Sequence, residues 1–148
     1  MIRHVWSILC QSASFDVQTN SVSLFNAIEL ITVFGSPSKE IPLVFSGEIV
    51  SLWTRSKEDV PVSGQMQVYL MQADKKASDS VISLEIDLNK TPFHRTRINI
   101  GGLPLFSTGR YEFCVEYKLA VNDPWQSAAR LPFYVIQESL PQMEMQNK

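Results

Sequence analysis

The chain has 148 residues, of which 45% are hydrophobic and 19% are charged, and its formal net charge at pH 7 is −2. This composition is typical of an ordinary globular domain and argues against disorder and fibrous repeats. Binding to nucleic acid would require a clustered excess of Lys and Arg, which this chain lacks, so we predict that it binds no nucleic acid. We expect one domain over residues 1–137 and a polar, frayed tail over residues 138–148.

The first apolar patch, from Val5 to Leu9, is too short for a secretory leader. A lipoprotein signal would need a small residue before Cys10, where the chain has the bulky Leu9. No run approaches the roughly 20 apolar residues that a membrane-spanning helix needs. We therefore predict a cytoplasmic protein without membrane contact, in which Cys10 and Cys114 stay reduced and bind no metal.

Alternation of apolar and polar residues predicts short strands throughout and no helix of useful length. The second strand changes phase near Phe25 and Asn26, which indicates a bulge that lets one segment pack in two directions. The segment over residues 33–42 contains Gly, Ser and Pro and is expected to be a loop. In chain order, the expected strands are residues 4–10, 21–31, 43–53, 65–72, 80–88, 93–100, 108–119 and 130–136.

A hairpin joining residues 80–88 to residues 93–100 is the most specific of these predictions. Pairing centred on Thr91 brings opposite charges together on one face and apolar side chains together on the other. The expected charged pairs are Glu85 with Arg97 and Asp87 with Arg95. Because a slip by one residue would turn every side chain over, this register is easily refuted.

The longest alternating run, residues 108–119, follows a turn at Gly109 and predicts a central strand with Tyr111, Phe113 and Val115 facing the core. Immunoglobulin-like folds often place a tyrosine at this corner, with its hydroxyl bonded to the backbone upstream. We predict an all-β, immunoglobulin-like antiparallel β-sandwich of about eight strands. A closed barrel is the alternative, and we disfavour it because residues 101–106 read as a crossing between sheets.

Two stretches carry the motifs of a wider resemblance: residues 15–28, with Asp16, Asn20, Ser23, Leu24 and Asn26, and residues 103–115, with Gly109, Tyr111, Phe113 and Val115 in a Gly-x-Tyr-x-Phe-x-Val pattern. On these residues, the chain resembles a family of small bacterial proteins of unknown function that share an immunoglobulin-like sandwich. The resemblance implies the fold and brings no activity with it.

Arg95 and Arg97, on one face of a strand, could bind an anion through charge-assisted hydrogen bonds. The simpler interpretation is that Asp87 and Glu85 neutralise them. The two histidines, His4 and His94, have no acidic or cysteine partner at metal-ligand spacing, so we predict neither a metal site nor a cofactor. We assign no catalytic residue.

Trp125, flanked by Asn122 and Asp123, occupies a loop at one end of the predicted sandwich, where such folds present binding residues. It could anchor a protein or stack on a sugar, or it could fold back over the core. Tyr69 and Met71 lie on the outward phase of their strand, either as part of an interface or as ordinary exposed apolar surface.

We therefore expect a non-catalytic binding or assembly module that contacts a protein partner or a second copy through a loop end or an outward sheet face. The first alternative is a small hydrolase or ligand-binding enzyme with a site near His94 and Arg95. The second is a carbohydrate-binding module that uses Trp125, expected only if a second aromatic residue lies beside it.

Overall fold

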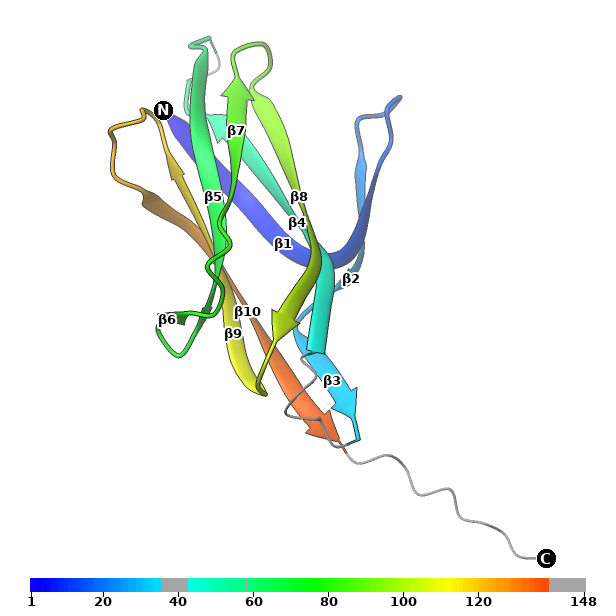
Figure 1. The fold of residues 1–148 in the computed structure, drawn as a ribbon. Helices are drawn as coiled ribbons and strands as arrows, with labels where there is room; N and C mark the ends of the chain where they lie inside the picture. The colour runs from blue at the N-terminus through cyan, green and yellow to red at the C-terminus, as the bar shows by residue number, and fades with distance from the viewer. Residues whose placement is uncertain (36–42, 58, 139–148) are drawn as a thin grey trace, which may run out of the picture.

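Two β-sheets pack face to face around one core in the computed structural model, which describes residues 1–35, 43–57 and 59–138 (Figure 1). Sheet A has the strand order β2-β1-β4-β8, and sheet B has the order β3-β10-β9-β5-β6, with β7 also paired to β5. The predicted all-β sandwich is confirmed. The strands are β1 (Ile2–Phe15), β2 (Val22–Ala27), β3 (Leu30–Phe34), β4 (Leu43–Arg55), β5 (Val62–Gln72), β6 (Lys75–Lys76), β7 (Ile82–Leu88), β8 (Phe93–Leu105), β9 (Gly109–Lys118) and β10 (Gln126–Glu138). Within the described ranges there is no helix with the length and apolar character needed to cross a membrane.

The core is built by the alternation seen in the sequence, because every second side chain of each strand points between the sheets. In sheet B, Phe133 stacks on both Tyr111 and Phe113, with ring centroids 5.5 and 5.6 Å apart. Phe45 of sheet A meets Phe133 at 5.4 Å, and Trp53 is fully buried. Each large apolar side chain of this kind contributes about 1.5–3 kcal/mol on burial.

Tyr111 also fixes the corner between the two sheets. Its hydroxyl donates a hydrogen bond of 2.8 Å to the carbonyl oxygen of Ser107, four residues upstream. Gly109, with a φ of 125°, allows the turn into β9. The backbone bond predicted for this tyrosine is therefore present. The crossing itself is shorter than predicted, because most of residues 101–106 extend β8. The more specific immunoglobulin-like assignment stays a prediction.

The predicted hairpin of β7 and β8 is wrong, because the two strands belong to different sheets. β7 pairs with β5, placing Glu85 opposite Gln65, while β8 pairs with β4, placing Arg97 opposite Val50. The apolar side chains of both strands do share an environment, but across the core rather than along a ladder. The charged pairs of Glu85 with Arg97 and Asp87 with Arg95 are consequently absent from the ion pairs of the described residues.

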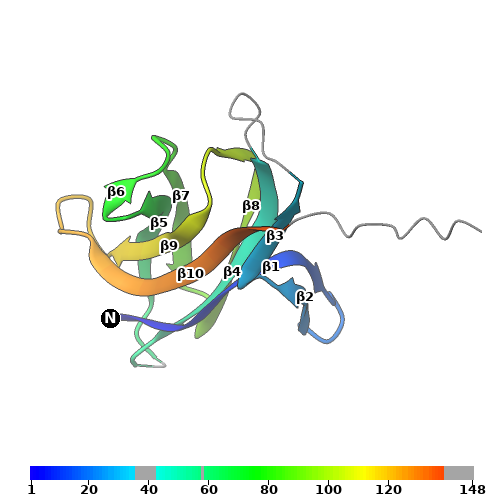
Figure 2. The same ribbon diagram turned by 90° about the horizontal axis from the view of Figure 1, so that it is seen from below.

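At the bulge predicted near Asn26, the expected single strand is in fact two strands that belong to different sheets. The chain leaves sheet A after β2, with Asn26 at a φ of 54°, and enters sheet B as β3. There β3 runs parallel to β10, with Leu30 opposite Tyr134, and the two strands lie side by side in Figure 2. Val33 and Phe34, expected in a loop, therefore belong to a strand. Most of that predicted loop, residues 36–42, and the tail over residues 139–148 lie outside the described residues.

Candidate functional site

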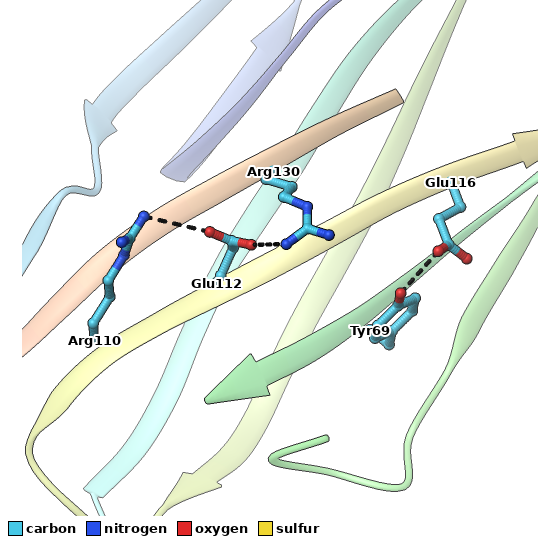
Figure 3. A network of polar contacts seen from close by, with 5 residues as sticks. All are labelled: Tyr69, Arg110, Glu112, Glu116 and Arg130. Atoms are coloured by element: carbon cyan, nitrogen blue, oxygen red, sulfur yellow. Dashed lines mark hydrogen bonds and ion pairs between the residues drawn. The ribbon is translucent and has the colours of Figure 1, made fainter. Parts of the chain in front are cut away.

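The outward side chains of β5, β9 and β10 form a polar network on the outer face of sheet B (Figure 3). Strand pairing creates it, because residues opposite each other in neighbouring strands point to the same face. Tyr69 of β5 and Arg130 of β10 both lie opposite Cys114 of β9. Two residues along, Met71 lies opposite Glu112.

Glu116 accepts hydrogen bonds on both of its carboxylate oxygens. The Tyr69 hydroxyl donates to Oε1 at 2.8 Å, and the Gln67 amide donates to Oε2 at 2.6 Å. Burial of the phenol, together with the adjacent Glu116 carboxylate, raises the pKa of Tyr69 far above its ordinary value. Tyr69 is therefore a neutral hydrogen-bond donor fixed in place at any physiological pH.

Glu112 lies between two arginines, as Figure 3 shows. Arg130 Nη1 donates to Oε1 at 3.0 Å, and Arg110 Nη2 approaches Oε2 at 3.5 Å. The hydrogen bond to Glu112 raises the pKa of the Arg130 guanidinium above its usual range. Both arginine side chains remain largely exposed, at 66% and 58%, so these ion pairs contribute little to stability. They do hold two guanidinium groups at one position on the surface.

A hollow of about 930 Å³ opens beside this network. It lies between the turn that joins β5 to β6 and the beginning of β9, and its size is within the range of ligand sites in proteins. In the turn, Ala73 and Asp74 have positive φ values of 49° and 62°, a conformation that is costly for residues with a Cβ. The hollow is lined by Met71, Gln72, Ala73, Asp74, Lys75, Lys76, Ala77, Ser107, Gly109, Arg110, Tyr111, Glu112 and Arg130.

The hollow is positively charged, although the whole chain is slightly acidic. Its lining contains four cations and two carboxylates, a net charge of +2, whereas the chain carries −2. Lys76 Nζ lies 5.2 Å from the centre of the Tyr69 ring, a cation–π arrangement that connects the hollow to the polar network. The side chains of Lys75 and Lys76 are exposed to solvent.

Cys114 lies on the outward phase of β9, but it is 5% exposed because its neighbours on the face cover it. Burial raises the pKa of its thiol, so it is a poor nucleophile at neutral pH. Both cysteines are free thiols. In the described part of the chain, no group of three His, Cys, Asp or Glu side chains is arranged to hold a metal ion.

Arg95 and Arg97 lie on the outer face of sheet A, where they contact the β1–β2 hairpin. Arg97 donates to Glu48 at 2.6 Å and to the carbonyl of Ala13 at 3.3 Å, while Arg95 donates to the carbonyl of Asn20 at 2.9 Å. The Phe15 ring lies 5.7 Å from Arg95 and 5.3 Å from Arg97. Both guanidinium groups thus hold the hairpin in place.

His94 and Arg95 do not converge on one site, because consecutive residues of a strand point to opposite faces. His94 Nδ1 lies 2.8 Å from the backbone nitrogen and oxygen of Asp87, on the side that faces β7. Its contacts connect β8 of sheet A to β7 of sheet B.

Trp125, Asn122 and Asp123 lie in the loop after β9, at the opposite end of that strand from Arg110. Trp125 is half-buried, and Lys118 Nζ lies 4.6 Å from its ring centroid. Asp123 closes the turn by accepting a hydrogen bond of 2.9 Å from the backbone of Ala120. Asn122 is exposed, and none of the aromatic ring pairs found in the described ranges includes Trp125.

Sequence reasoning missed a partly buried chain of polar side chains near the start of β1. His4 Nε2 lies 2.7 Å from the Ser7 hydroxyl, which lies 2.6 Å from the hydroxyl of Ser51. A register shift between His4 and Trp6 turns these side chains toward the core. The His4 ring meets the edge of Trp53 at 5.1 Å, and burial lowers the pKa of its imidazole. We interpret this group as part of the core, since no carboxylate among the described residues contacts His4.

No protein-family model matches this chain, and none of the curated proteins matches it. The family resemblance expected from the sequence therefore stays a prediction.

Proposed function

We propose that this protein is a non-catalytic binding module that docks a protein partner on the outer face of sheet B. The single observation that carries the proposal is the positively charged hollow beside the network of Tyr69, Glu112 and Arg130. A concave surface with preorganised polar groups is the usual form of a recognition site. We further propose a cytoplasmic location, which the two unpaired cysteines support.

The residue types on this face also support the proposal. Tyrosine, methionine and arginine are enriched at protein interfaces and among the residues that contribute most to binding. Tyr69, Met71, Arg110 and Arg130 lie on this face over β5, β9 and β10, and Tyr134, 47% exposed, extends it along β10. The contacts to Glu112 and Glu116 hold the aromatic and guanidinium groups in place before a partner arrives, which lowers the entropy cost of binding.

The other surfaces raised by the sequence have weaker support. Arg97 is paired with Glu48, and Arg95 donates to the carbonyl of Asn20 in the β1–β2 hairpin, so both side chains already have a structural role. Trp125 presents a ring that Lys118 already covers on one side. No observation of the described residues favours an enzyme over a binding module, so we propose no reaction.

Affinity capture with variants tests the proposal. The tagged wild-type protein, the double variant Arg110→Ala/Arg130→Ala and the control Lys90→Ala are each used to capture proteins from cells of the source organism. Lys90 is exposed in the turn between β7 and β8 and does not line the hollow. We expect a partner recovered equally by wild-type and Lys90→Ala and reduced at least tenfold with the double variant. Equal recovery by all three, with matched thermal stability, would contradict the proposal.

A further inference from the structure

We infer that the segment bound in the hollow is an acidic peptide: an extended stretch of a partner protein that carries several carboxylates. This inference rests on the proposed function and names the chemistry of its partner. It is carried by the hydrogen-bonding capacity of the face and by the charge of the hollow.

The acceptors of the network are already occupied. Both oxygens of Glu116 accept hydrogen bonds, from Tyr69 and Gln67, and both oxygens of Glu112 have arginine partners. Each of these four oxygens thus has a donor within the protein, so these carboxylates attract a ligand's donors less than unpaired ones would.

The donors, in contrast, are in surplus. Arg110 and Arg130 each direct one nitrogen at Glu112 in the described contacts, and a guanidinium carries several further N–H groups. The exposed ammonium groups of Lys75 and Lys76 add donors on the other side of the hollow. Four cations against the two carboxylates Asp74 and Glu112 favour a ligand that brings acceptors, and carboxylates match guanidinium groups in both charge and geometry.

The charge of the hollow also favours an acidic ligand. Its lining carries +2, opposite in sign to the chain as a whole, so an acidic segment is attracted to this part of the surface in preference to the rest. The apolar side chains of Met71 and Ala77 lie in the same lining and can contact the aliphatic stems of glutamate side chains.

A second copy of the chain fits this surface less well. A two-fold contact would bring this patch, which carries +2, against an identical patch of the same charge. Like charges brought together in this way weaken association. We therefore assign the hollow to a partner of different sequence.

Titration of the ¹⁵N-labelled full chain with a capped hexaglutamate peptide, followed by NMR, tests the inference. Capped hexaglutamine is the neutral control for the peptide. We expect hexaglutamate to shift the amide signals of residues 71–77 and 107–112 and that of Arg130, with hexaglutamine giving no shifts. We also expect weaker binding at higher salt, because the attraction is between exposed charges.

Matched variants make the test specific. Lys75→Glu/Lys76→Glu is expected to weaken hexaglutamate binding at least tenfold, while Lys90→Glu, which changes one exposed lysine outside the hollow, is expected to leave it within twofold. Equal shifts with both peptides, or equal binding by both variants, would overturn the inference. So would tighter binding of hexathymidylate than of hexaglutamate, or a dimer in light scattering that Lys75→Glu/Lys76→Glu dissociates.

Failure of this inference is distinguishable from failure of the proposed function. If Arg110→Ala/Arg130→Ala abolishes capture of a partner but hexaglutamate does not bind, the outer face of sheet B remains the docking surface and the acidic chemistry is wrong.

Discussion

The ring and the hydroxyl of Tyr111 make different contacts, and replacing the tyrosine with phenylalanine removes only the hydroxyl. The ring packs in the core, and the hydroxyl donates to Ser107 at the corner between the sheets. We predict that Tyr111→Phe lowers the free energy of unfolding by about 1 kcal/mol, because it leaves a carbonyl without its donor. Urea unfolding measures this. Tyr134→Phe removes a hydroxyl from a 47% exposed side chain and is the control, expected to cost nothing measurable.

His4 predicts a pH dependence of stability. Burial lowers its pKa in the folded protein, so the unfolded chain binds a proton first as the pH falls through about 6.5. Stability that is fully present above that pH is therefore lost below it. We predict that replacing His4 with Gln reduces the drop in melting temperature between pH 7.5 and pH 5.5, measured by scanning calorimetry. An unchanged drop in the His4 variant would contradict this account of the partly buried imidazole.

At the scale of strands, Gly64 marks a close approach between β5 and its neighbours. A Cβ at this position would lie 2.6 Å from the backbone oxygen of Lys118 and from Ile2 Cδ1, whereas at Gly101 nothing lies within 4 Å. We predict that Gly64→Ala destabilises the protein by about 1–3 kcal/mol through forced displacement of β9. Gly101→Ala should be neutral within about 0.5 kcal/mol. Equal urea midpoints for the two variants would contradict the packing described for this pair of strands.

The turn between β5 and β6 is strained because an alanine occupies a position with positive φ. Ala73 has a φ of 49°, where asparagine is far better tolerated than alanine. We predict that Ala73→Asn stabilises the fold by about 0.5–1 kcal/mol without altering the charge of the hollow. Ala120→Asn, at an exposed turn position outside the positive-φ residues, is the control. A loss of stability in Ala73→Asn would mean that the alanine methyl group makes a contact that outweighs the strain.

Strand identity could be predicted from local pattern, but strand partners could not. The alternation around Tyr111, Phe113 and Val115 reports only which face is buried, and that face was predicted correctly. Whether β7 pairs with β8 or with β5 depends on the rest of sheet B, so the charged pairs expected for Arg95 and Arg97 were wrong. The same limit hid the parallel pairing of β3 with β10.

For the same reason, most of the candidate site could not be predicted: it depends on which strands are neighbours in sheet B. Tyr69 could be chosen from the sequence because its outward phase is local. Glu112 and Arg130 belong to different strands, and only their pairing in sheet B shows that they meet. The two residues of β6, Lys75 and Lys76, join them through the pairing of β6 with β5. A surface made of several strands therefore becomes visible only when the order of the strands is known.

For the molecule as a whole, the central claim is that the outer face of sheet B binds a partner and the loop carrying Trp125 does not. The most direct measurement is an NMR map of the ¹⁵N-labelled chain with the captured partner. We expect the perturbed amides to cluster at Tyr69, Met71, Arg110, Glu112 and Arg130, with residues 119–125 unchanged. Perturbations centred on Asn122, Asp123 and Trp125, with sheet B's outer face unchanged, would contradict it and assign binding to the loop end of the sandwich.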